Sequence, residues 1–365
     1  MTFSFIDDLG PEKLIELYDP RAGLKAILVV DNTAAGPSIG GVRMAPDVSA
    51  EECFRLARAM SFKNAAAGLA HGGGKSVIFA DPAMATQDKE KLIRAFARAI
   101  AEIEDYISGP DMGTNEIAMA WVKDEIGRAA GLPREIGGIP LDEIGATGYG
   151  LAAAAEVAQN YCGLKLSRAR IAIQGFGSVG IHAARFLAEK GAVIVGVSDS
   201  RGTISNPDGL DLPAIIRLKR EGKRVAEFSG GIKGQVDAII GVKCDIWIPA
   251  ARPDVVTMKN VDRLSAKLIL EGANIPIELE AEKALHKRGV MIVPDFIANA
   301  GGVICAAVEY ARGTEAQALA VIGEKIAANT EEVLSSAKRG AITPREAAIA
   351  MAKTRIQRAM SYRGS

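Results

Sequence analysis

The sequence has little cysteine, little histidine and no excess of either charge. Its 365 residues include four cysteines and three histidines, and 44 basic side chains balance 44 acidic ones. The cysteines form no C-x-x-C pair, which argues against a zinc site or a disulfide framework and favours a reducing, cytoplasmic compartment. Three scattered histidines are poor material for a metal cluster, so we expect no metal.

Further classes are excluded by the balanced charge and by the lack of a long apolar run. A nucleic-acid or anionic-membrane partner needs a clustered basic excess, which a formal net charge of zero does not offer. No run of 18 apolar residues occurs, and two acids lie within MTFSFIDDLG, so we expect neither a membrane span nor a targeting peptide. The length suffices for about two domains.

A segment rich in glycine and proline, residues 131–150, predicts a hinge or domain boundary. Before it, the pattern predicts an α+β region with strands at Leu24–Val30 and Ser76–Ala80 and helices at Ala50–Ala67 and Asp88–Asp105.

After the hinge, apolar runs alternate with helical segments, which predicts a parallel, doubly wound sheet. The expected elements are a helix at Ser178–Lys190 and strands at Arg170–Gln174, Ala192–Ser198, Asp245–Ile248, Lys267–Leu270 and Val290–Val293. Residues 300–363 look helical, with a break at 341–344. The expected fold class is α/β: an N-terminal α+β substrate and oligomerisation domain, residues 1–135 with C-terminal helices from about 331 to 365, and a Rossmann-type dinucleotide domain, residues 145–330.

One G-x-G-x-x-G string, GFGSVG at 175–180, lies between an expected strand and an expected helix. Gly175 would permit the tight turn, Gly177 the approach of a pyrophosphate to the backbone, and Gly180 the packing of helix on strand. The helix N-terminus would supply amide donors to the phosphates. The residues assigned to the dinucleotide here are Gly175, Gly177, Ser178, Val179 and Gly180. An ordinary glycine turn is the alternative.

An acid, Asp199, ends the second strand, 24 residues after Gly175 and close to the ~20 typical of a ribose-binding carboxylate. It would accept hydrogen bonds from the ribose hydroxyls and repel a 2′-phosphate, which favours NAD. Arg201, two residues on, could bind that phosphate instead, so NADP stays open.

Two lysines stand where lysine is unfavourable. Lys63 shares a helical stripe with Leu56, Met60 and Ala67, and a charged amine on an apolar face costs free energy unless it is paired or used. A lysine that snorkels at the edge of the stripe is the alternative.

The second lysine, Lys75, follows three glycines that would leave room for a small molecule. The tail GKS suggests a P-loop, but that motif needs glycine where Leu69 stands, and it needs a strand before and a helix after. If Lys63 and Lys75 face one cleft, each cation disfavours the other's charge and burial acts in the same direction, so one amine could serve as a base near neutral pH.

A polar loop, GPDMGT at 109–114, places Asp111 between turn residues. The functional interpretation is an acid that shuttles protons, and the alternative is an Asx turn or a helix cap.

These motifs together resemble the glutamate/leucine/phenylalanine/valine dehydrogenase family, over nearly the whole chain. The matching segments occur in the family's order: GPSIGGVRM at 36–44, MSFKNA at 60–65, GGGK at 72–75, PDMGT at 110–114, ATGYG at 146–150, the fingerprint at 175–180, EGAN at 271–274, PD at 294–295 and NAGGV at 299–303.

The resemblance implies oxidative deamination of an L-amino acid to a 2-oxo acid and ammonia, with a hydride transferred to NAD(P). By it, Lys63 would bind the α-carboxylate, Lys75 would activate water for attack on the imino carbon, and Asp111 would exchange protons with the substrate. Domain closure over the hinge would exclude water before hydride transfer.

By the same resemblance, Thr147 and Asn274 would lie near the nicotinamide and the substrate, and Asn299 would line the same cleft. Family members assemble as symmetric homo-oligomers through the N-terminal domain, so a homo-oligomer is expected.

Two departures from the glutamate enzymes of the family bear on the substrate. A lysine that meets the distal carboxylate is replaced by Ile39, and a serine seven residues after Asn299 is replaced by Ala306. A buried carboxylate there would be penalised, so we expect an apolar substrate such as leucine, valine, isoleucine or phenylalanine. The residues assigned to the substrate are Lys63, Gly41, Ile39, Met60, Asn274 and Ala306.

Other classes stay open at this point. The segments PDMGTN and SDS look more like the glutamate branch, so a glutamate dehydrogenase is the first alternative. A 2-hydroxy-acid dehydrogenase would use a histidine base, and no histidine lies in a convincing catalytic loop. An NAD-binding paralogue that has lost its chemistry is opposed by the intact Lys63, Lys75 and Asp111.

Overall fold

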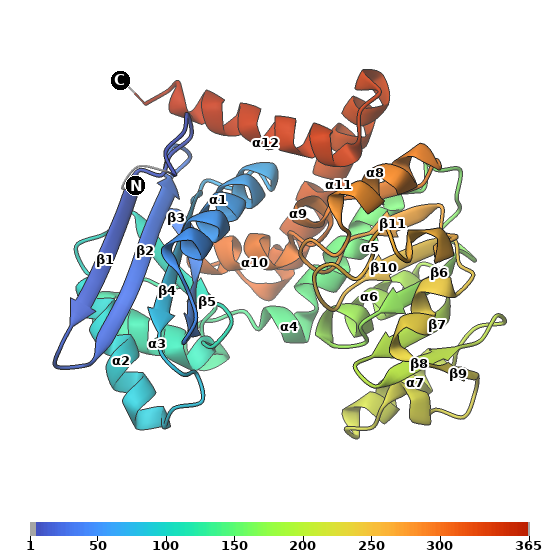
Figure 1. The fold of residues 1–365 in the computed structure, drawn as a ribbon, viewed down its shortest axis with the longest axis horizontal. Helices are drawn as coiled ribbons and strands as arrows, with labels where there is room; N and C mark the ends of the chain where they lie inside the picture. The colour runs from blue at the N-terminus through green and yellow to red at the C-terminus, as the bar shows by residue number, and fades with distance from the viewer. Residues whose placement is uncertain (1–4, 364–365) are drawn as a thin grey trace. The chain divides into compact units, whose positions relative to one another are not determined.

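The computed structural model describes residues 5–363, and the chain forms two compact units. Unit 1 comprises residues up to 141, 303–318 and the residues from 349 onward; unit 2 comprises 142–302 and 319–348 (Figure 1). Both units are α/β, and unit 2 has a Rossmann-like sheet, so the predicted fold class is confirmed.

Unit 1 is built on a mixed sheet of five strands in the order β1-β2-β4-β3-β5. The strands are β1 (Lys13–Asp19), β2 (Leu24–Asn32), β3 (Ser38–Ala45), β4 (Gly72–Phe79) and β5 (Tyr106–Pro110). Strand β3 runs parallel to both β4 and β5, and therefore their carboxyl ends lie at one edge of the sheet. Asp111 directly follows β5 at this edge, whereas Lys75 lies in the middle of β4.

The helices of unit 1 cover both faces of its sheet. Helix α1 (Ala50–Ala66) packs on β2 and β4 around Cys53, Ala57 and Val77. Helices α2 (Thr86–Ala99) and α3 (Glu116–Ile126) cover the other face, where Phe96, Met119 and Tyr106 are buried. A short helix η1 (Arg134–Ile136), most of α10 (Gly301–Tyr310) and the end of α12 (Pro344–Met360) complete the unit.

Two boundaries in unit 1 differ from the sequence prediction by more than two residues. The helix expected at Asp88–Asp105 ends at Ala99, because Ile100 and Ile103 continue the apolar spacing while the chain already turns toward β5. The strand expected to begin at Ser76 begins at Gly72, so the three glycines belong to the strand itself.

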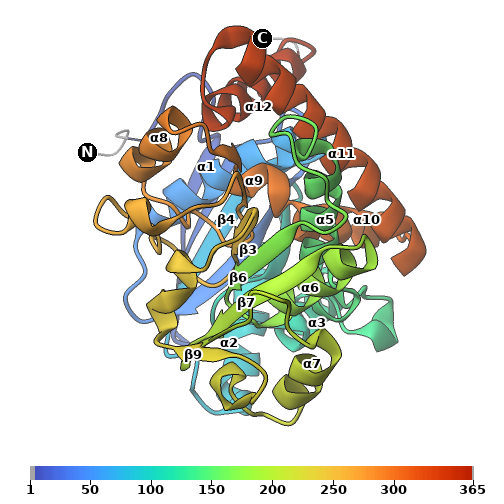
Figure 2. The ribbon, with the colours of Figure 1, turned by 90° about the vertical axis from the view of Figure 1, so that its right-hand side faces the viewer.

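Unit 2 holds a seven-stranded sheet in the order β12-β11-β10-β6-β7-β8-β9. The strands are β6 (Arg170–Gln174), β7 (Val193–Asp199), β8 (Gly202–Ser205), β9 (Ile232–Gly234), β10 (Ile246–Pro249), β11 (Leu268–Leu270) and β12 (Met291–Val293). The strands from β12 to β7 are parallel and β8 and β9 are antiparallel (Figure 2). The strand order reverses between β10 and β6, where ligands of such sheets bind.

Trp247, Ile269 and Ile292 lie in the core on one side of this sheet. The helices of unit 2 are α4 (Leu141–Ile144), α5 (Ala146–Ala158), α6 (Ser178–Glu189), α7 (Leu212–Arg220), α8 (Leu279–Lys287), α9 (Asp295–Ala298) and most of α11 (Glu315–Gly340), with short helices η2 (Val225–Glu227), η3 (Val236–Gly241) and η4 (Val261–Arg263). None of the helices in residues 5–363 has both the length and the apolar content needed to cross a membrane.

Candidate functional site

Strand alternation in unit 1 directs the key side chains to the face of the sheet that α1 covers. In β3, Ile39 and Gly41 share that face, and in the neighbouring β4 Lys75 does so. The Lys75 side chain is buried, and its Nζ lies 2.8 Å from Oδ2 of Asp111, just beyond the end of β5. The parallel strands therefore bring the lysine and the acid of two separate sequence motifs into contact.

The Asp111 carboxylate lies between two cations. Its Oδ2 accepts from Lys75 and also from Nε of Arg43, 2.9 Å away, while Arg43 contacts Glu52 through Nη1 at 2.5 Å. Burial raises the pKa of the Asp111 carboxyl, but the charges and hydrogen bonds of Lys75 and Arg43 outweigh burial and hold that pKa below its ordinary value. The carboxylate is thus ionised.

The loop holds Asp111 through its backbone. The Asp111 N–H donates to Thr114 Oγ1 at 3.0 Å, and that hydroxyl donates to the Val42 carbonyl at 2.8 Å. The N-cap of α3 is Asn115, and its side chain accepts from the amide of Ala118. The side chain of Asp111 therefore faces Lys75 and does not serve as the cap that the sequence left open.

Burial is the main reason that the pKa of Lys75 lies below its ordinary value. Asp111 opposes this effect and stabilises the cation, while the nearby charge of Arg43 lowers the pKa further. The sequence led us to expect Lys63 to be the cation that lowers the pKa of Lys75. Arg43 supplies the larger effect, because the planar guanidinium contacts the same carboxylate oxygen as Lys75 does.

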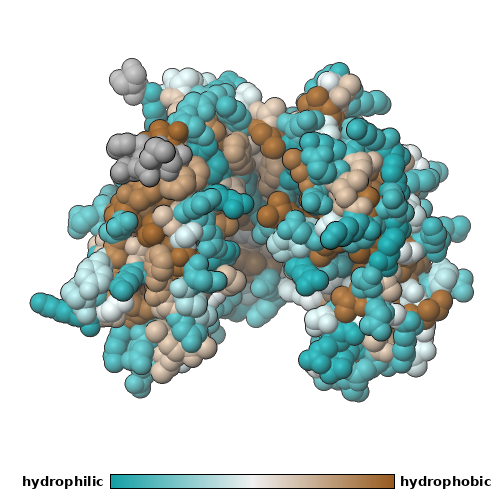
Figure 3. Space-filling model, in the orientation of Figure 1, coloured by the Kyte–Doolittle hydropathy of each residue, from teal (hydrophilic) through white to brown (hydrophobic). Residues whose placement is uncertain are grey.

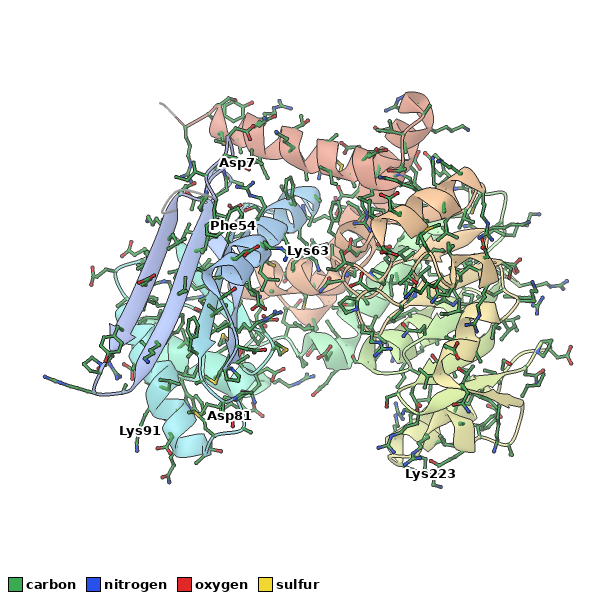
Figure 4. The ribbon with its side chains drawn as sticks, in the orientation of Figure 1. Asp7, Phe54, Lys63, Asp81, Lys91 and Lys223 are labelled. Atoms are coloured by element: carbon green, nitrogen blue, oxygen red, sulfur yellow. The ribbon has the colours of Figure 1, made fainter. Side chains whose placement is uncertain are left out.

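The face of α1 that packs on the sheet is not the helical stripe predicted to contain Lys63, but the row of residues next to it. The residues of α1 that face the sheet include Cys53, Ala57, Ser61 and Asn64. Met60 and Lys63 are half-buried on the flank of that row, so Lys63 is not fixed in an apolar core (Figure 4). Lys63 lies in the last turn of α1.

Glycine at position 41 is required by the contact between lysine and acid. A Cβ there would lie 2.9 Å from Lys75 Nζ and 2.7 Å from Asp111 Cβ. The glycines of the 72–74 run have a different role from the expected one. A Cβ at Gly72 would meet the Asn32 carbonyl, and one at Gly73 would meet the Ser61 amide at 2.0 Å. A Cβ at Gly74 would meet the side chains of Ser38 and Tyr106, so the three glycines make room for other parts of the protein.

An apolar cluster extends from the same face of the sheet. Ile39 and Ile107, paired across β3 and β5, are buried with Ala130, and Ala306 of α10 packs against them. The carboxylate of Glu309, three residues after Ala306, accepts from the amides of residues 131, 132 and 139 at 2.8–3.0 Å. The two positions at which the sequence departs from glutamate enzymes thus lie in one cluster.

In the fingerprint turn of unit 2, each of the three glycines has different steric surroundings. Gly175 has a φ of +95°, and a Cβ there would lie 2.7 Å from Ala251 Cβ. Gly180 lies against the Gly175 carbonyl, which a Cβ would approach to 2.0 Å. Gly177 is the N-cap of α6 and has open space around its Cβ position. The exposed Ser178 and half-buried Val179 begin the helix, so the amides face accessible space.

The carboxylate of Asp199 at the end of β7 already has partners on both oxygens. Oδ1 accepts from the Arg201 amide at 2.9 Å, and Oδ2 accepts from Lys219 Nζ at 2.9 Å and from the Val225 amide at 3.0 Å. Burial raises the pKa of this carboxyl, but these donors outweigh burial and lower it below the ordinary value. The acid is therefore an ionised member of an ion pair with Lys219.

Two asparagines predicted for the cofactor lie in contact. The Nδ2 of Asn299 donates to Asn274 Oδ1 at 2.9 Å, and Oδ1 of Asn299 is buried with no partner among the described residues. Thr147 on α5 lies beside Gly302, where a Cβ would be 3.7 Å from the threonine hydroxyl. The amide oxygen of Asn299 thus has no protein donor among the described residues.

Further unsatisfied groups lie at the carboxyl ends of neighbouring strands. Oε1 of Gln174 and Oγ of Ser198 are buried without partners, and they end β6 and nearly end β7. The Ser198 carbonyl accepts from the amides of Gly175 and Phe176, so both side chains lie beside the glycine turn. Sequence reasoning missed Gln174, Ser198 and Arg43. The polar Gln174 at the end of an apolar strand was the available signal.

The cysteines of the described residues are free thiols. Cys53, Cys162, Cys244 and Cys305 are not in disulfides. Within residues 5–363, no group of three or more His, Cys, Asp or Glu side chains is placed to hold a metal ion.

Two family models match the chain. Residues 137–364 match the model described as glutamate/leucine/phenylalanine/valine dehydrogenase, and residues 11–128 match the dimerisation domain of the same family. Together the matches cover most of the sequence.

Curated relatives of similar length give the same family. A glutamate dehydrogenase of Aeropyrum pernix is 38% identical over 91% of this chain and 85% of the relative. An NADP-specific glutamate dehydrogenase of Saccharolobus shibatae is 35% identical over 91% of this chain and 84% of the relative. The catabolic NAD-specific glutamate dehydrogenase RocG of Bacillus subtilis is 38% identical over 78% of this chain and 70% of the relative.

Solved structures with the same fold include enzymes for different amino acids. The hetero-hexameric glutamate dehydrogenase of Thermus thermophilus, in a leucine-bound form, has a TM-score of 0.84 at 27% identity, over 97% of this chain and 90% of that one. An L-tryptophan dehydrogenase of Nostoc punctiforme has a TM-score of 0.78 at 25% identity, over 99% of this chain and 100% of that one.

Proposed function

The chain belongs to the glutamate/leucine/phenylalanine/valine dehydrogenase family, and from this premise we propose that it oxidatively deaminates an apolar L-amino acid, reversibly, to the 2-oxo acid and ammonia. The protein is an oxidoreductase, an amino-acid dehydrogenase dependent on NAD or NADP. The observation that carries the proposed substrate class is the cluster of Ile39, Ile107, Ala130 and Ala306 on the face of the sheet that holds Lys75.

The proposed chemistry assigns separate tasks to the acid and the lysine of unit 1. When bound, the dinucleotide takes up a hydride from the substrate α-carbon. The ionised Asp111 stabilises the positive charge that develops on the substrate nitrogen and exchanges protons with it. Lys75 in its neutral form, favoured by burial, takes a proton from the water that attacks the imino carbon. Release of ammonia from the resulting carbinolamine gives the 2-oxo acid.

The α-carboxylate of the substrate is assigned to Lys63 by the family resemblance, and its half-buried position is compatible with that role. In unit 2, the fingerprint would hold the pyrophosphate, and Thr147, Asn274 and Asn299 would meet the nicotinamide end. The direct contact between Asn274 and Asn299 supports this assignment, because it brings the residues of two separate motifs together.

The proposed preference for an apolar side chain follows from the lack of a cation in the apolar cluster. A glutamate side chain against Ile39 and Ala306 would exchange hydration for apolar contacts, and none of the four cluster residues carries a cation or a donor side chain. Glutamate is the second candidate, and the names of the curated relatives favour it, since relatives at 35–38% identity are glutamate dehydrogenases.

A substrate panel separates the two candidates. The rate of NADH formation is measured at 340 nm with leucine, isoleucine, valine, phenylalanine and glutamate at equal concentrations. We expect one of the apolar amino acids to give the highest kcat/KM. Faster turnover of glutamate would overturn the apolar assignment while keeping the dehydrogenase, and no turnover of any amino acid would favour a paralogue that has lost its chemistry.

We propose NAD as the preferred cofactor, with NADP accepted. The charge of Asp199 is balanced by Lys219, so a 2′-phosphate does not meet an uncompensated carboxylate. The ratio of kcat/KM for NAD and NADP tests this, and a preference of more than about a thousandfold for either cofactor would contradict it, since that needs ~4 kcal/mol of discrimination.

We also propose a homo-oligomer assembled through unit 1. Strand β1 is an edge strand with half or more of its side chains exposed, including Leu14 and Tyr18, and Figure 3 shows hydrophobic side chains on the face that carries β1 and β2. Unpaired apolar edges invite pairing with another chain. Light scattering should give a mass above the 38.3 kDa of one chain. A monomeric mass would refute the proposal. The cytoplasmic location stays a prediction.

A further inference from the structure

One arginine of unit 2 holds three carboxylates from three different elements. Arg345, at the start of α12, contacts Glu271 Oε2 at 2.6 Å, Glu282 Oε2 at 2.5 Å and Asp295 Oδ1 at 3.0 Å. Glu271 follows β11, Glu282 lies on α8 and Asp295 begins α9. All four side chains are at most 13% exposed. All three guanidinium nitrogens of Arg345 contact this cluster of carboxylates. No family motif assigned a function to the cluster.

Two of these carboxylates also hold the backbone beside the cofactor candidates. Glu271 Oε2 accepts from the Asp295 amide at 2.8 Å, and Asp295 Oδ2 accepts from the Ile275 amide at 2.8 Å. Ile275 has a φ of +42°, in the left-handed region that a β-branched residue rarely adopts. Such a conformation persists only when its surroundings hold it. The neighbour before it in the chain is Asn274.

The same cluster reaches the second asparagine. The Asn299 amide donates to the Asp295 carbonyl at 2.7 Å, and the Asn299 side chain donates to Asn274. Asp295 thus links Arg345 to the amide of Ile275, the residue next to Asn274, and to the backbone amide of Asn299. The cluster thus lies beside both asparagines, although Arg345 lies some 46 residues further along the chain than Asn299.

The charges of the cluster do not balance if every acid is ionised. Three carboxylates would face one guanidinium, and Glu271 Oε1 is buried with no partner. Burial, with the charges of Asp295 and Glu282, raises the pKa of Glu271 to about 8, against the opposing charge of Arg345. His286, also on α8, acts to lower the pKa of Glu282, which burial raises. The raised pKa favours the protonated form of Glu271 at neutral pH.

We propose that Arg345 is a positioning residue for the nicotinamide end of the dinucleotide: through its three carboxylate contacts it holds the 271–275 loop and the start of α9 so that Asn274 and Asn299 are preset to bind. This inference rests on the proposed function, which assigns those two asparagines to the nicotinamide end. The adenosine end, bound at the fingerprint and Asp199, has no bond to the cluster. A defect in the cluster should therefore affect one end of the cofactor only.

The experiment compares two ligands that differ in the nicotinamide. NADH and ADP-ribose share the adenosine and both phosphates, but ADP-ribose lacks the nicotinamide ring. Arg345→Lys keeps the positive charge but cannot contact all three carboxylates through a planar guanidinium. We expect it to weaken NADH binding about tenfold or more, as for loss of a buried charged hydrogen bond, and to change ADP-ribose binding less than about twofold. The matched control, Arg263→Lys, alters an exposed ion pair with Asp237 in the same unit and should leave both affinities unchanged.

Equal weakening of both ligands would show a merely structural role and overturn the proposal, as would unchanged NADH binding. If Arg345→Lys does not fold, Glu271→Gln replaces it, because glutamine mimics the protonated acid. This variant should bind NADH like the wild type at pH 7 and keep that affinity at pH 9, where the wild type weakens. A loss at pH 7, or no weakening of the wild type, would refute the proposal. Wild type that binds no NADH at all would instead refute the proposed function.

Discussion

Alanine at position 41 is expected to damage catalysis by moving one amine. The added Cβ would lie 2.9 Å from Lys75 Nζ and 2.7 Å from Asp111 Cβ, whereas real Cβ atoms essentially never come closer than 3.0 Å and rarely closer than 3.4 Å. Either the lysine or the acid must retreat by roughly 0.5 Å or more, and the 2.8 Å contact between Lys75 and Asp111 is the one that breaks.

The magnitude follows from this displacement. Overpacking of this kind costs about 1–3 kcal/mol in stability, which a domain of ordinary stability survives. Misplacing a catalytic group by ~1 Å costs up to about a hundredfold in rate. We therefore expect Gly41→Ala to fold, to bind NADH normally, and to lose about ten- to a hundredfold in kcat/KM for the best amino acid.

A matched control lies directly across the strand pair. Gly109 pairs with Gly41 in the β3–β5 register, but a Cβ there would be 3.9 Å from its nearest neighbour. Gly109→Ala should lose at least tenfold less activity than Gly41→Ala, measured as NADH formation at 340 nm in parallel with a thermal melt. If Gly41→Ala keeps full activity, or if both variants lose activity equally, the contact between Lys75 and Asp111 does not set the rate.

Four further changes test other parts of the account. Lys75→Ala should lower kcat by at least about a hundredfold with NADH affinity retained in a fluorescence titration, as for removal of a general base, and near-normal turnover would remove Lys75 from the mechanism. Ile39→Lys combined with Ala306→Ser should raise the ratio of glutamate to leucine turnover; an unchanged ratio would place the specificity elsewhere. Lys219→Ala frees the Asp199 carboxylate and should lower kcat/KM for NADP more than for NAD, so equal losses would be evidence against the ion pair's role. Because the pKa of Glu271 is raised to about 8, its proton stabilises the fold most below the ordinary value of 4.5, and this contribution is lost as pH rises through about 8. The melting temperature should accordingly fall less between pH 6 and pH 9 in Glu271→Gln than in the wild type, and parallel curves would contradict the assignment.

Local pattern was sufficient to predict the elements with clear boundaries. The strand Arg170–Gln174 and the start of the helix at Ser178 agree with the structure, because a buried apolar run and a glycine turn define both ends. Local pattern failed for β4, where glycines with low strand propensity form the strand because Asn32 and Ser61 approach too closely for any side chain.

The site was predictable as a set of motifs but not as a network. Lys75 and Asp111 stood out individually, and their contact depends on the order β4-β3-β5, which no single segment encodes. Arg43 was overlooked because its role comes from sharing a carboxylate oxygen with Lys75 across the sheet. Arg345 was overlooked for a related reason, since its three acids come from elements that are far apart in the sequence.

The central claim is that a buried Lys75, held against an ionised Asp111 beside Arg43, is the base of the reaction. The most direct measurement is kcat/KM for oxidative deamination from pH 6 to pH 11, for the wild type and for Arg43→Gln. The wild type should rise to a plateau with an apparent pKa below 10.5, and the variant should rise at higher pH, because Arg43 lowers the pKa of Lys75. A flat wild-type profile, or a variant profile that coincides with it, would contradict the account.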